Sequence, residues 1–189
     1  MFLINDLIAL LAANLILSQA LGTSTIFIAA ASKKNLIATA CVITFFTSAG
    51  SAAAYLIDSI LPDFASDLRL LFYIAVIGVL YVALLAVLYC MKGSHFEELR
   101  KYVHLSAFNC AVMGTLFTIN ERACTDEINS IGGYFLAGLE AGIGFITAAL
   151  ILTAAYRKLN SSKVPAAFRG FPAMLVYLGI ISMAVYSLK

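Results

Sequence analysis

Two adjacent side chains in the stretch AFNCAVMG, residues 107–114, have chemistry that an apolar helix does not need. The thiolate form of Cys110 is a ligand for soft metals and for the iron of iron–sulfur clusters. A free cysteine also packs as a small apolar residue, and no CxxC spacing in the chain indicates a self-contained metal site. Asn109 adds a polar amide beside the thiol. From residue types alone, metal ligation and packing both stay open for Cys110.

Two further polar residues lie in long apolar runs and are candidates for an ion path. Glu140 lies near the centre of the run 131–156, where an acid is costly to bury. It indicates either a proton or cation relay or a buried hydrogen-bond partner at a subunit contact. Asn14 lies in the first apolar run, where such amides commonly bond a neighbouring helix. Gly138 and Gly142 form a GxxxG pair around Glu140, a spacing typical of close helix packing.

These side chains must be positioned by membrane-spanning helices. Of the 189 residues, 62% are hydrophobic and 12% are charged, and the mean hydropathy is +0.98, values that exclude a soluble domain. About six apolar runs with few charges approach the ~20 residues needed to cross a bilayer. The loops are too short for a second domain, so residues 1–189 are predicted to form one all-α integral membrane domain. The predicted spans are 3–22, 35–60, 70–91, 103–119, 131–156 and 171–187.

The distribution of Lys and Arg predicts the orientation. With six spans, nine basic residues fall on one face and three on the other, and basic loops stay on the cytoplasmic side. Both termini are therefore expected outside the cytoplasm of a plasma (inner) membrane, and the net charge of +2 does not indicate a nucleic-acid partner. The nine basic residues expected on the cytoplasmic face are Lys33, Lys34, Lys92, Arg100, Lys101, Arg157, Lys158, Lys163 and Arg169. The three basic residues expected on the opposite face are Arg69, Arg122 and Lys189.

The first and fourth runs contain features that break helices. The sequence GTST at 22–25 interrupts the first run, and the fourth run is short and holds Asn109, Cys110 and Gly114 near its centre. Breaks at corresponding places in two groups of three spans predict an inverted repeat of three plus three helices. Its halves are 1–91 and 92–189, and such repeats place their site where the broken helices meet.

Three stretches together carry a resemblance to a known family. They are LG at 21–22 followed by SKK at 32–34, NCAVMG at 109–114, and VPAAFRG at 164–170. In their order and over nearly the full length, the chain resembles the A subunits of the Rnf (also called Rsx) electron-transport complex. It is more distantly similar to the E subunits of the sodium-pumping NADH:quinone reductase, Nqr. The VPAAFRG form favours Rnf.

The resemblance implies a non-catalytic membrane subunit of a ferredoxin:NAD⁺ oxidoreductase that drives Na⁺ or H⁺ translocation. A homologous six-helix subunit is its expected partner, together with iron–sulfur and flavin subunits, in the lipid membrane. A [2Fe–2S] cluster shared between the two homologous subunits would carry electrons across the membrane. By position, Cys110 matches a cluster ligand of the family, Asn109 helps satisfy the broken backbone, and Gly22 and Gly114 belong to the cluster surroundings.

The chain departs from the family pattern at the other expected ligand. Where the family has its first cysteine, this chain has Ser24, and no cysteine precedes Cys41. Three alternatives follow: Ser24 is an unusual ligand, the cluster takes three thiolates, or the homologue holds no cluster. The family also usually carries an acid in span three, where this chain has Tyr81 and Tyr89.

Other classes of function remain as alternatives. A cluster-free six-helix transport subunit would bind a small molecule or ion in a cavity around Asn14, Ser24, Asn109 and Glu140. A purely structural scaffold for a membrane complex is a third interpretation. The sequence contains no GxGxxG, P-loop or HExxH motif, so a nucleotide site or a zinc-protease site within this chain is not indicated.

Overall fold

The protein is an all-helical membrane protein. Its structure, a computed structural model, describes residues 17, 21–23, 25–26, 33–60, 68–90, 96–125, 128–162 and 164–187. Within these ranges there are six helices and no strand. The predicted all-α membrane class is thereby confirmed, and the inverted repeat of residues 1–91 and 92–189 stays a prediction. The helices are α4 (Lys33–Ile60), α5 (Arg69–Cys90), α6 (Phe96–Ala107), α7 (Cys110–Cys124), α8 (Ile131–Leu159) and α9 (Phe171–Tyr186).

Most of the predicted spans have a counterpart among these helices. Three segments are long and apolar enough to cross a bilayer: Asn35–Ile60, Arg69–Cys90 and Ile131–Tyr156. The segments Leu99–Ala107 and Cys110–Cys124 together are apolar enough for one further span or a re-entrant pair, bent by 45° at a break, and α9 is an apolar helix of 16 residues. Except for residues 17, 21 and 22, the first predicted span lies outside the described residues.

The fourth span begins earlier in the sequence than predicted. Helix α6 contains the charged segment that precedes residue 103, and it leads directly into the break before α7. The predicted span, 103–119, began later because the charges of Arg100 and Lys101 interrupt the apolar run. Both side chains are exposed, so the charges are compatible with the helix.

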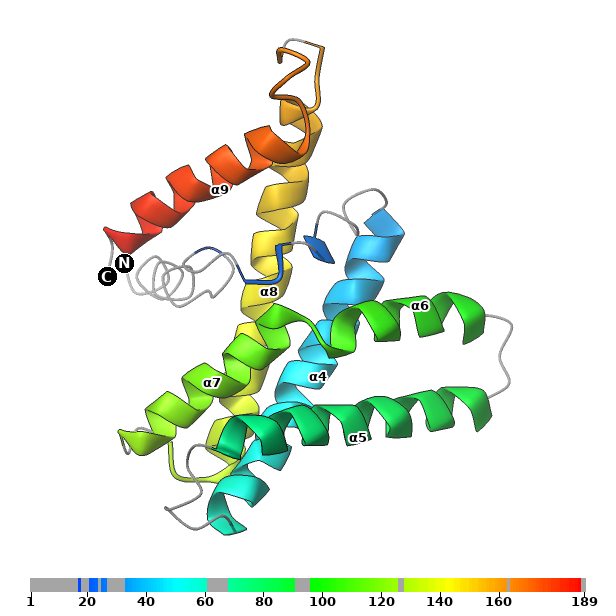
Figure 1. Ribbon diagram of the computed structural model, residues 1–189, viewed down its shortest axis with the longest axis vertical. Coiled ribbons are helices and arrows are strands. Elements are labelled where there is room, and N and C mark those ends of the chain that lie inside the picture. The colour runs from blue at the N-terminus through cyan, green and yellow to red at the C-terminus, as the bar shows by residue number, and fades with distance from the viewer. Residues whose placement is uncertain are drawn as a thin grey trace.

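The centre of the fold is the pair α4 and α8, two long helices that run side by side (Figure 1). Gly138 and Gly142 of α8 lie against α4 at very short range. A methyl group on Gly138 would lie 2.4 Å from the Thr47 carbonyl oxygen, and one on Gly142 would lie 2.6 Å from the Thr44 methyl carbon. The GxxxG pair is therefore a packing feature, as the sequence predicted.

The surface of α4 that faces α8 carries small hydroxyl residues, whose hydroxyl groups donate hydrogen bonds to carbonyl groups of α4 itself. Thr44, Ser48 and Ser51 each donate a hydrogen bond to the carbonyl four residues earlier, at 2.8, 2.8 and 2.5 Å. Hydroxyl groups bonded in this way need no water, so they are tolerated inside a membrane protein. They leave space for the two glycines of α8 and thereby bring the two helices into close contact.

Replacing Gly138 by alanine should loosen this helix pair. The added methyl group meets backbone atoms of α4, which cannot move aside without displacing the helix, so we expect a loss of about 1–3 kcal/mol in the free energy of unfolding. Unfolding of the purified protein in mixed detergent micelles measures this loss. Gly132→Ala in the same helix is the matched control, because nothing lies within 4 Å of a methyl group there. Equal stability of the two variants would contradict the close approach.

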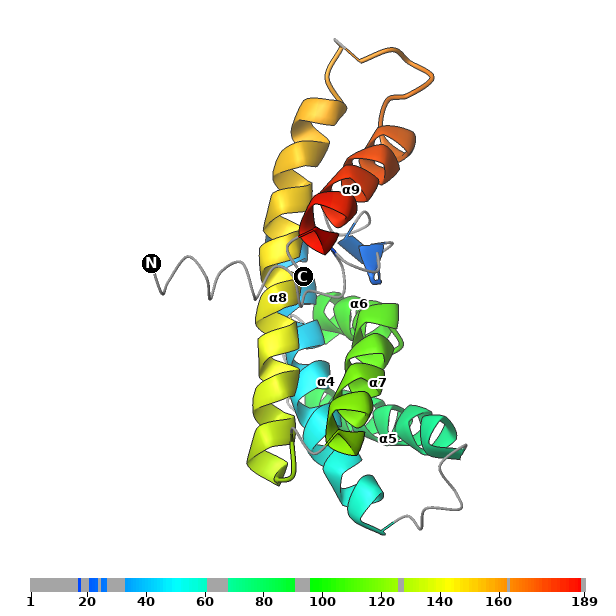
Figure 2. The same cartoon turned by 90° about the vertical axis from the view of Figure 1, so that its left-hand side faces the viewer.

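The remaining helices pack around the central pair. Helices α5 and α6 lie next to each other and cross α4, whereas α9 lies against the other end of α8 (Figure 2). Helix α7 contacts both α4 and α8. The break between α6 and α7 therefore lies beside the central pair, where side chains from several helices surround it.

Candidate functional site at the helix break

Asn109 makes the break between α6 and α7. Its backbone is extended (φ −78°, ψ 140°), and its Oδ1 accepts a hydrogen bond of 3.1 Å from the backbone N–H of Ala111. It is therefore the N-cap of α7, a position that favours asparagine because its side chain replaces a missing backbone acceptor. The side chain is 4% exposed. The prediction that Asn109 satisfies the broken backbone is confirmed.

A second break lies directly against the first. Gly22 adopts φ +79°, a left-handed conformation that L side chains rarely adopt. A methyl group there would lie 2.8 Å from the Ala111 Cβ, 3.1 Å from the Asn109 Oδ1 and 3.3 Å from the Phe145 ring. The chain at 21–22 turns at this point, and a hydrogen bond from Ile26 N–H to the Gly22 carbonyl follows. The interruptions of the first and fourth runs therefore meet in space, as predicted.

The Cys110 side chain faces away from this contact and lines an open pocket. Cys110 is the first residue of α7 and its side chain is exposed. The pocket has a volume of about 420 Å³, and Leu21 and Gly114 also line it. Residues from both broken segments thus share one pocket. Its other lining residues are Phe108, Met113, Phe117, Thr118 and Glu121.

Two polar features lie beside Cys110. The N-terminal end of a helix carries a partial positive charge from its unpaired N–H groups, which attracts an electron-rich group. Next to it, the Asn109 Nδ2 is buried and has no hydrogen-bond partner within the described part of the chain. An unpaired buried donor costs free energy.

The other cysteines lie elsewhere. Cys124 is the last residue of α7, so about 21 Å of helix separates it from Cys110 at roughly 1.5 Å per residue. Cys41 and Cys90 belong to α4 and α5 and are exposed. Among the described residues, no three His, Cys, Asp or Glu side chains are grouped in a way that holds a metal ion. Ser24 and Asn14, two further predicted site residues, lie outside the described residues.

Glu140 is not buried inside this chain. Its carboxylate lies 3.9 Å from the Arg122 guanidinium, and the two side chains are 50% and 36% exposed. Neither Glu140 nor Asn109 lines the Cys110 pocket. The sequence placed Arg122 in a loop, whereas it belongs to the last turn of α7, where its charge faces α8. Glu140 is therefore a half-exposed, ion-paired carboxylate and not a buried one within this chain.

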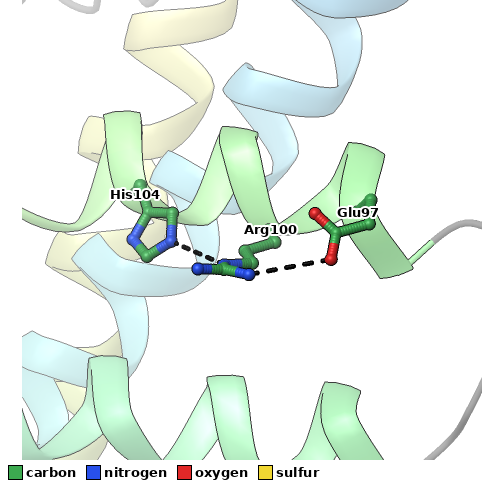
Figure 3. Close-up of polar contacts among 3 residues, drawn as sticks. All are labelled: Glu97, Arg100 and His104. Atoms are coloured by element: carbon green, nitrogen blue, oxygen red, sulfur yellow. Dashed lines mark hydrogen bonds and ion pairs between the residues drawn. The ribbon is translucent and has the colours of Figure 1, made fainter.

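A polar ladder that sequence reasoning missed runs along α6. The Glu97 carboxylate lies 3.6 Å from the Arg100 Nη1, and the Arg100 Nε donates to the His104 Nε2 at 3.1 Å (Figure 3). The other ring nitrogen of His104 forms a hydrogen bond with the Tyr81 hydroxyl of α5. The i, i+3 and i, i+4 spacing in the charged segment was the available signal.

A second group of hydrogen-bonded polar residues, which the sequence did not predict, lies where the ends of four helices meet. The Tyr73 hydroxyl lies 2.7 and 2.9 Å from the two Asp58 carboxylate oxygens, and the Tyr134 hydroxyl donates to Oδ2 at 3.0 Å. The Arg69 Nη1 donates to the Asn120 Oδ1 at 3.1 Å. These residues come from α4, α5, α7 and α8. Only an acid near the end of an apolar run pointed to this group, and the partners of that acid are 15 and 76 positions away in the sequence.

Comparison with known proteins gives one consistent result. The family described as Rnf-Nqr subunit, membrane protein, matches residues 5–189. The A subunit of the ion-translocating oxidoreductase complex of Glaesserella parasuis is 29% identical over 143 residues, which cover 75% of this chain and 72% of that protein. The A subunit of the Na(+)-translocating ferredoxin:NAD(+) oxidoreductase complex of Acetobacterium woodii is 27% identical over 173 residues, 90% of this chain and 88% of that protein. The E subunit of the Na(+)-translocating NADH-quinone reductase of Psychromonas ingrahamii is 29% identical over 127 residues, 65% of this chain and 60% of that protein.

Proposed function

The chain belongs to the Rnf-Nqr family of membrane subunits, and from this premise we propose that it is the A-type subunit of an ion-translocating ferredoxin:NAD⁺ oxidoreductase. In this role it has no nucleotide site of its own. It passes electrons through the membrane between other subunits, and this flow is coupled to the movement of Na⁺ or H⁺. The relatives with this name cover most of the chain, which supports the assignment.

The observation that carries the proposal is the position of Cys110. Its exposed thiol lies at the start of α7, in a pocket lined by both broken segments. A redox centre held there would lie within the bundle and not in a loop. The partial positive charge of the helix N-terminus favours an electron-rich ligand at this point.

The residues present fit one ligand position of a [2Fe–2S] cluster. Cys110 would supply a thiolate, and the remaining ligands would come from Ser24 or from a homologous partner subunit. When bound, the cluster supplies a one-electron carrier whose potential depends on burial and hydrogen bonding. The protein's own contribution is to hold the thiol at a rigid helix start and to keep the backbone on both sides of it capped.

The open pocket also indicates where the partner subunit would lie. Phe108 and Phe117, two aromatic residues of its lining, are 54% and 43% exposed in this chain. A homologous six-helix subunit that covers them would bring its own broken helices to Cys110. Iron–sulfur and flavin subunits would complete the electron path on either side of a plasma membrane, with both termini of this chain outside the cytoplasm.

Co-purification tests the assignment. A complex isolated through an affinity tag on this chain is expected to contain a homologous membrane subunit, non-haem iron and flavin, and to reduce NAD⁺ with reduced ferredoxin. A strain that lacks this chain should lose the membrane-bound activity and keep the soluble subunits. Recovery of the tagged chain without any redox subunit, from membranes that retain full activity, would refute the proposal.

Glu140 is the residue of the described part that we propose for the ion path. Glu140→Gln removes a half-exposed ion pair worth about 0–1 kcal/mol, so assembly should be unaffected. We expect fewer ions moved per electron in proteoliposomes, with an unchanged redox rate when an ionophore is present. Asn14 is proposed for the same path. Glu97→Gln, which alters an exposed carboxylate on α6, is the matched control; an unchanged ion-to-electron ratio in Glu140→Gln would exclude this role.

One observation favours a second candidate, a cluster-free transport subunit. The described residues place a single thiol in the pocket, and the position of the family's other cysteine holds Ser24. In that case the pocket would accept a small molecule or ion, and the tagged complex would contain no iron beyond that of its soluble subunits. The iron content of the membrane subunits therefore separates the two candidates.

A further inference from the structure

A polar cavity lies at one end of the bundle, away from the Cys110 pocket. Its volume is about 330 Å³, within the ~300–1,000 Å³ range of small-molecule sites. It forms where α4 ends and α5 begins, beside the last turn of α7 and the first turn of α8. Ends of membrane helices lie at the level of the lipid head groups. The lining residues used below are Tyr55, Asp58, Arg69 and Tyr134.

The negative side of the cavity is the Asp58 carboxylate. The hydroxyl groups of Tyr73 and Tyr134 donate to it, and these two residues are 2% and 3% exposed, so the carboxylate is held rigidly. A carboxylate offers about four acceptor positions, and these hydroxyl groups occupy only part of them. Asp58 therefore has acceptor capacity left for a positively charged donor inside the cavity.

The positive side is the Arg69 guanidinium, and it does not neutralise Asp58. Among the described residues, its hydrogen bonds run from Nη1 alone, to the Asn120 Oδ1 at 3.1 Å and the Cys124 sulfur at 3.8 Å. The Nε is buried and has no partner among the described residues. The two charged groups line one cavity without forming a direct ion pair with each other. Such an arrangement complements a ligand that carries both an anionic and a cationic group.

The remaining walls fit the position of a lipid. Tyr55 and Tyr134 pack edge to face, with ring centroids 5.3 Å apart, and form an aromatic wall beside the carboxylate. From Arg69 onwards, α5 presents an apolar surface in which Leu70 and Leu71 are 39% and 63% exposed. Acyl chains that leave the cavity would lie against this surface, whereas a soluble ligand would not use it.

We propose that this cavity binds the head group of a zwitterionic phospholipid with a primary ammonium, of the phosphoethanolamine class. The phosphate accepts hydrogen bonds from the Arg69 guanidinium, whose planar fork suits phosphate oxygens. The ammonium donates to Asp58 beside the tyrosine rings, where a cation is also attracted by the aromatic faces. A quaternary ammonium has no N–H to donate, so the site should distinguish ethanolamine from choline lipids.

Native mass spectrometry and thermal unfolding of the full chain in detergent test the proposal, with short-chain phosphatidylethanolamine, phosphatidylcholine and phosphatidylglycerol as probes. We expect phosphatidylethanolamine to bind about tenfold more tightly than the other two, the ratio that one charge-assisted hydrogen bond gives. It should also raise the unfolding temperature most, because a ligand of the folded state stabilises that state. Equal binding of the three lipids would overturn the proposal.

Variants locate the site. Asp58→Asn keeps an oxygen for the two tyrosine hydroxyl groups, so it should fold, and it should lose the preference for ethanolamine over choline. Arg69→Gln should weaken binding of all three phospholipids, whereas Glu97→Gln on α6 should change nothing. A preference retained in Asp58→Asn would overturn the proposal. Stabilisation by soluble glycerophosphoethanolamine but by no lipid would also overturn it, because the ligand would then be a soluble phosphoester.

Discussion

The Cys110→Ala complex should assemble but lose one two-iron signal and its electron transfer from ferredoxin to NAD⁺. The exposed thiol contributes little to packing, so the membrane subunits should still associate. Loss of a thiolate removes a ligand that iron–sulfur clusters require. Electron paramagnetic resonance of the dithionite-reduced complex, with iron and acid-labile sulfide, measures the loss. The difference from the unmodified complex isolates this cluster from those of other subunits.

Two other exposed thiols provide matched controls for this result. Cys41→Ala changes a cysteine of α4, and Cys124→Ala changes one at the far end of α7; both should keep the full signal and activity. If Cys110→Ala gives spectra identical to those of the controls, Cys110 is not a cluster ligand, and the cluster-free alternative is favoured. If the signal is lost, Ser24→Ala is the next variant, because its spectrum decides whether serine is a ligand.

Gly22→Ala is expected to cost about 2–5 kcal/mol of unfolding free energy, the sum of two effects. An alanine at φ +79° pays about 1–2 kcal/mol for the left-handed backbone. Its methyl group also lies 2.8 Å from the Ala111 Cβ, and overpacking typically costs about 1–3 kcal/mol. The substitution should also move the two helix breaks apart and thereby change the rate at which a maleimide labels Cys110. Detergent unfolding and labelling rates measure the two consequences.

A second glycine separates the two effects. Gly170 has φ +85° and nothing within 4 Å of an added methyl group, so Gly170→Ala reports the backbone effect alone. Combining Gly22→Ala with Ala111→Gly should recover part of the loss, because the clashing Cβ is removed. A Gly22→Ala variant as stable as Gly170→Ala would contradict the contact between the breaks.

Composition and spacing predicted the membrane class, the helical spans and both breaks. Apolar runs of helical length have one stable solution in a bilayer, because every backbone group must be bonded within its own segment. Asn109 was readable as a helix interruption because a polar amide in an apolar run competes with the backbone for hydrogen bonds. The GxxxG pair at Gly138 could also be recognised from the local sequence, because small residues at that spacing form one face of a helix.

By itself, then, the sequence determined which segments are helices, where two of them break, and which thiol lies at a break. Only the tertiary structure decided which groups meet. Gly22 contacts Ala111 across 89 positions, Tyr134 donates to Asp58 across 76, and Glu140 is paired with Arg122 at an exposed surface. Such contacts depend on how helices rotate and approach, and in lipid this is set by shape and hydrogen bonding between helices. A local pattern in one chain does not contain that information.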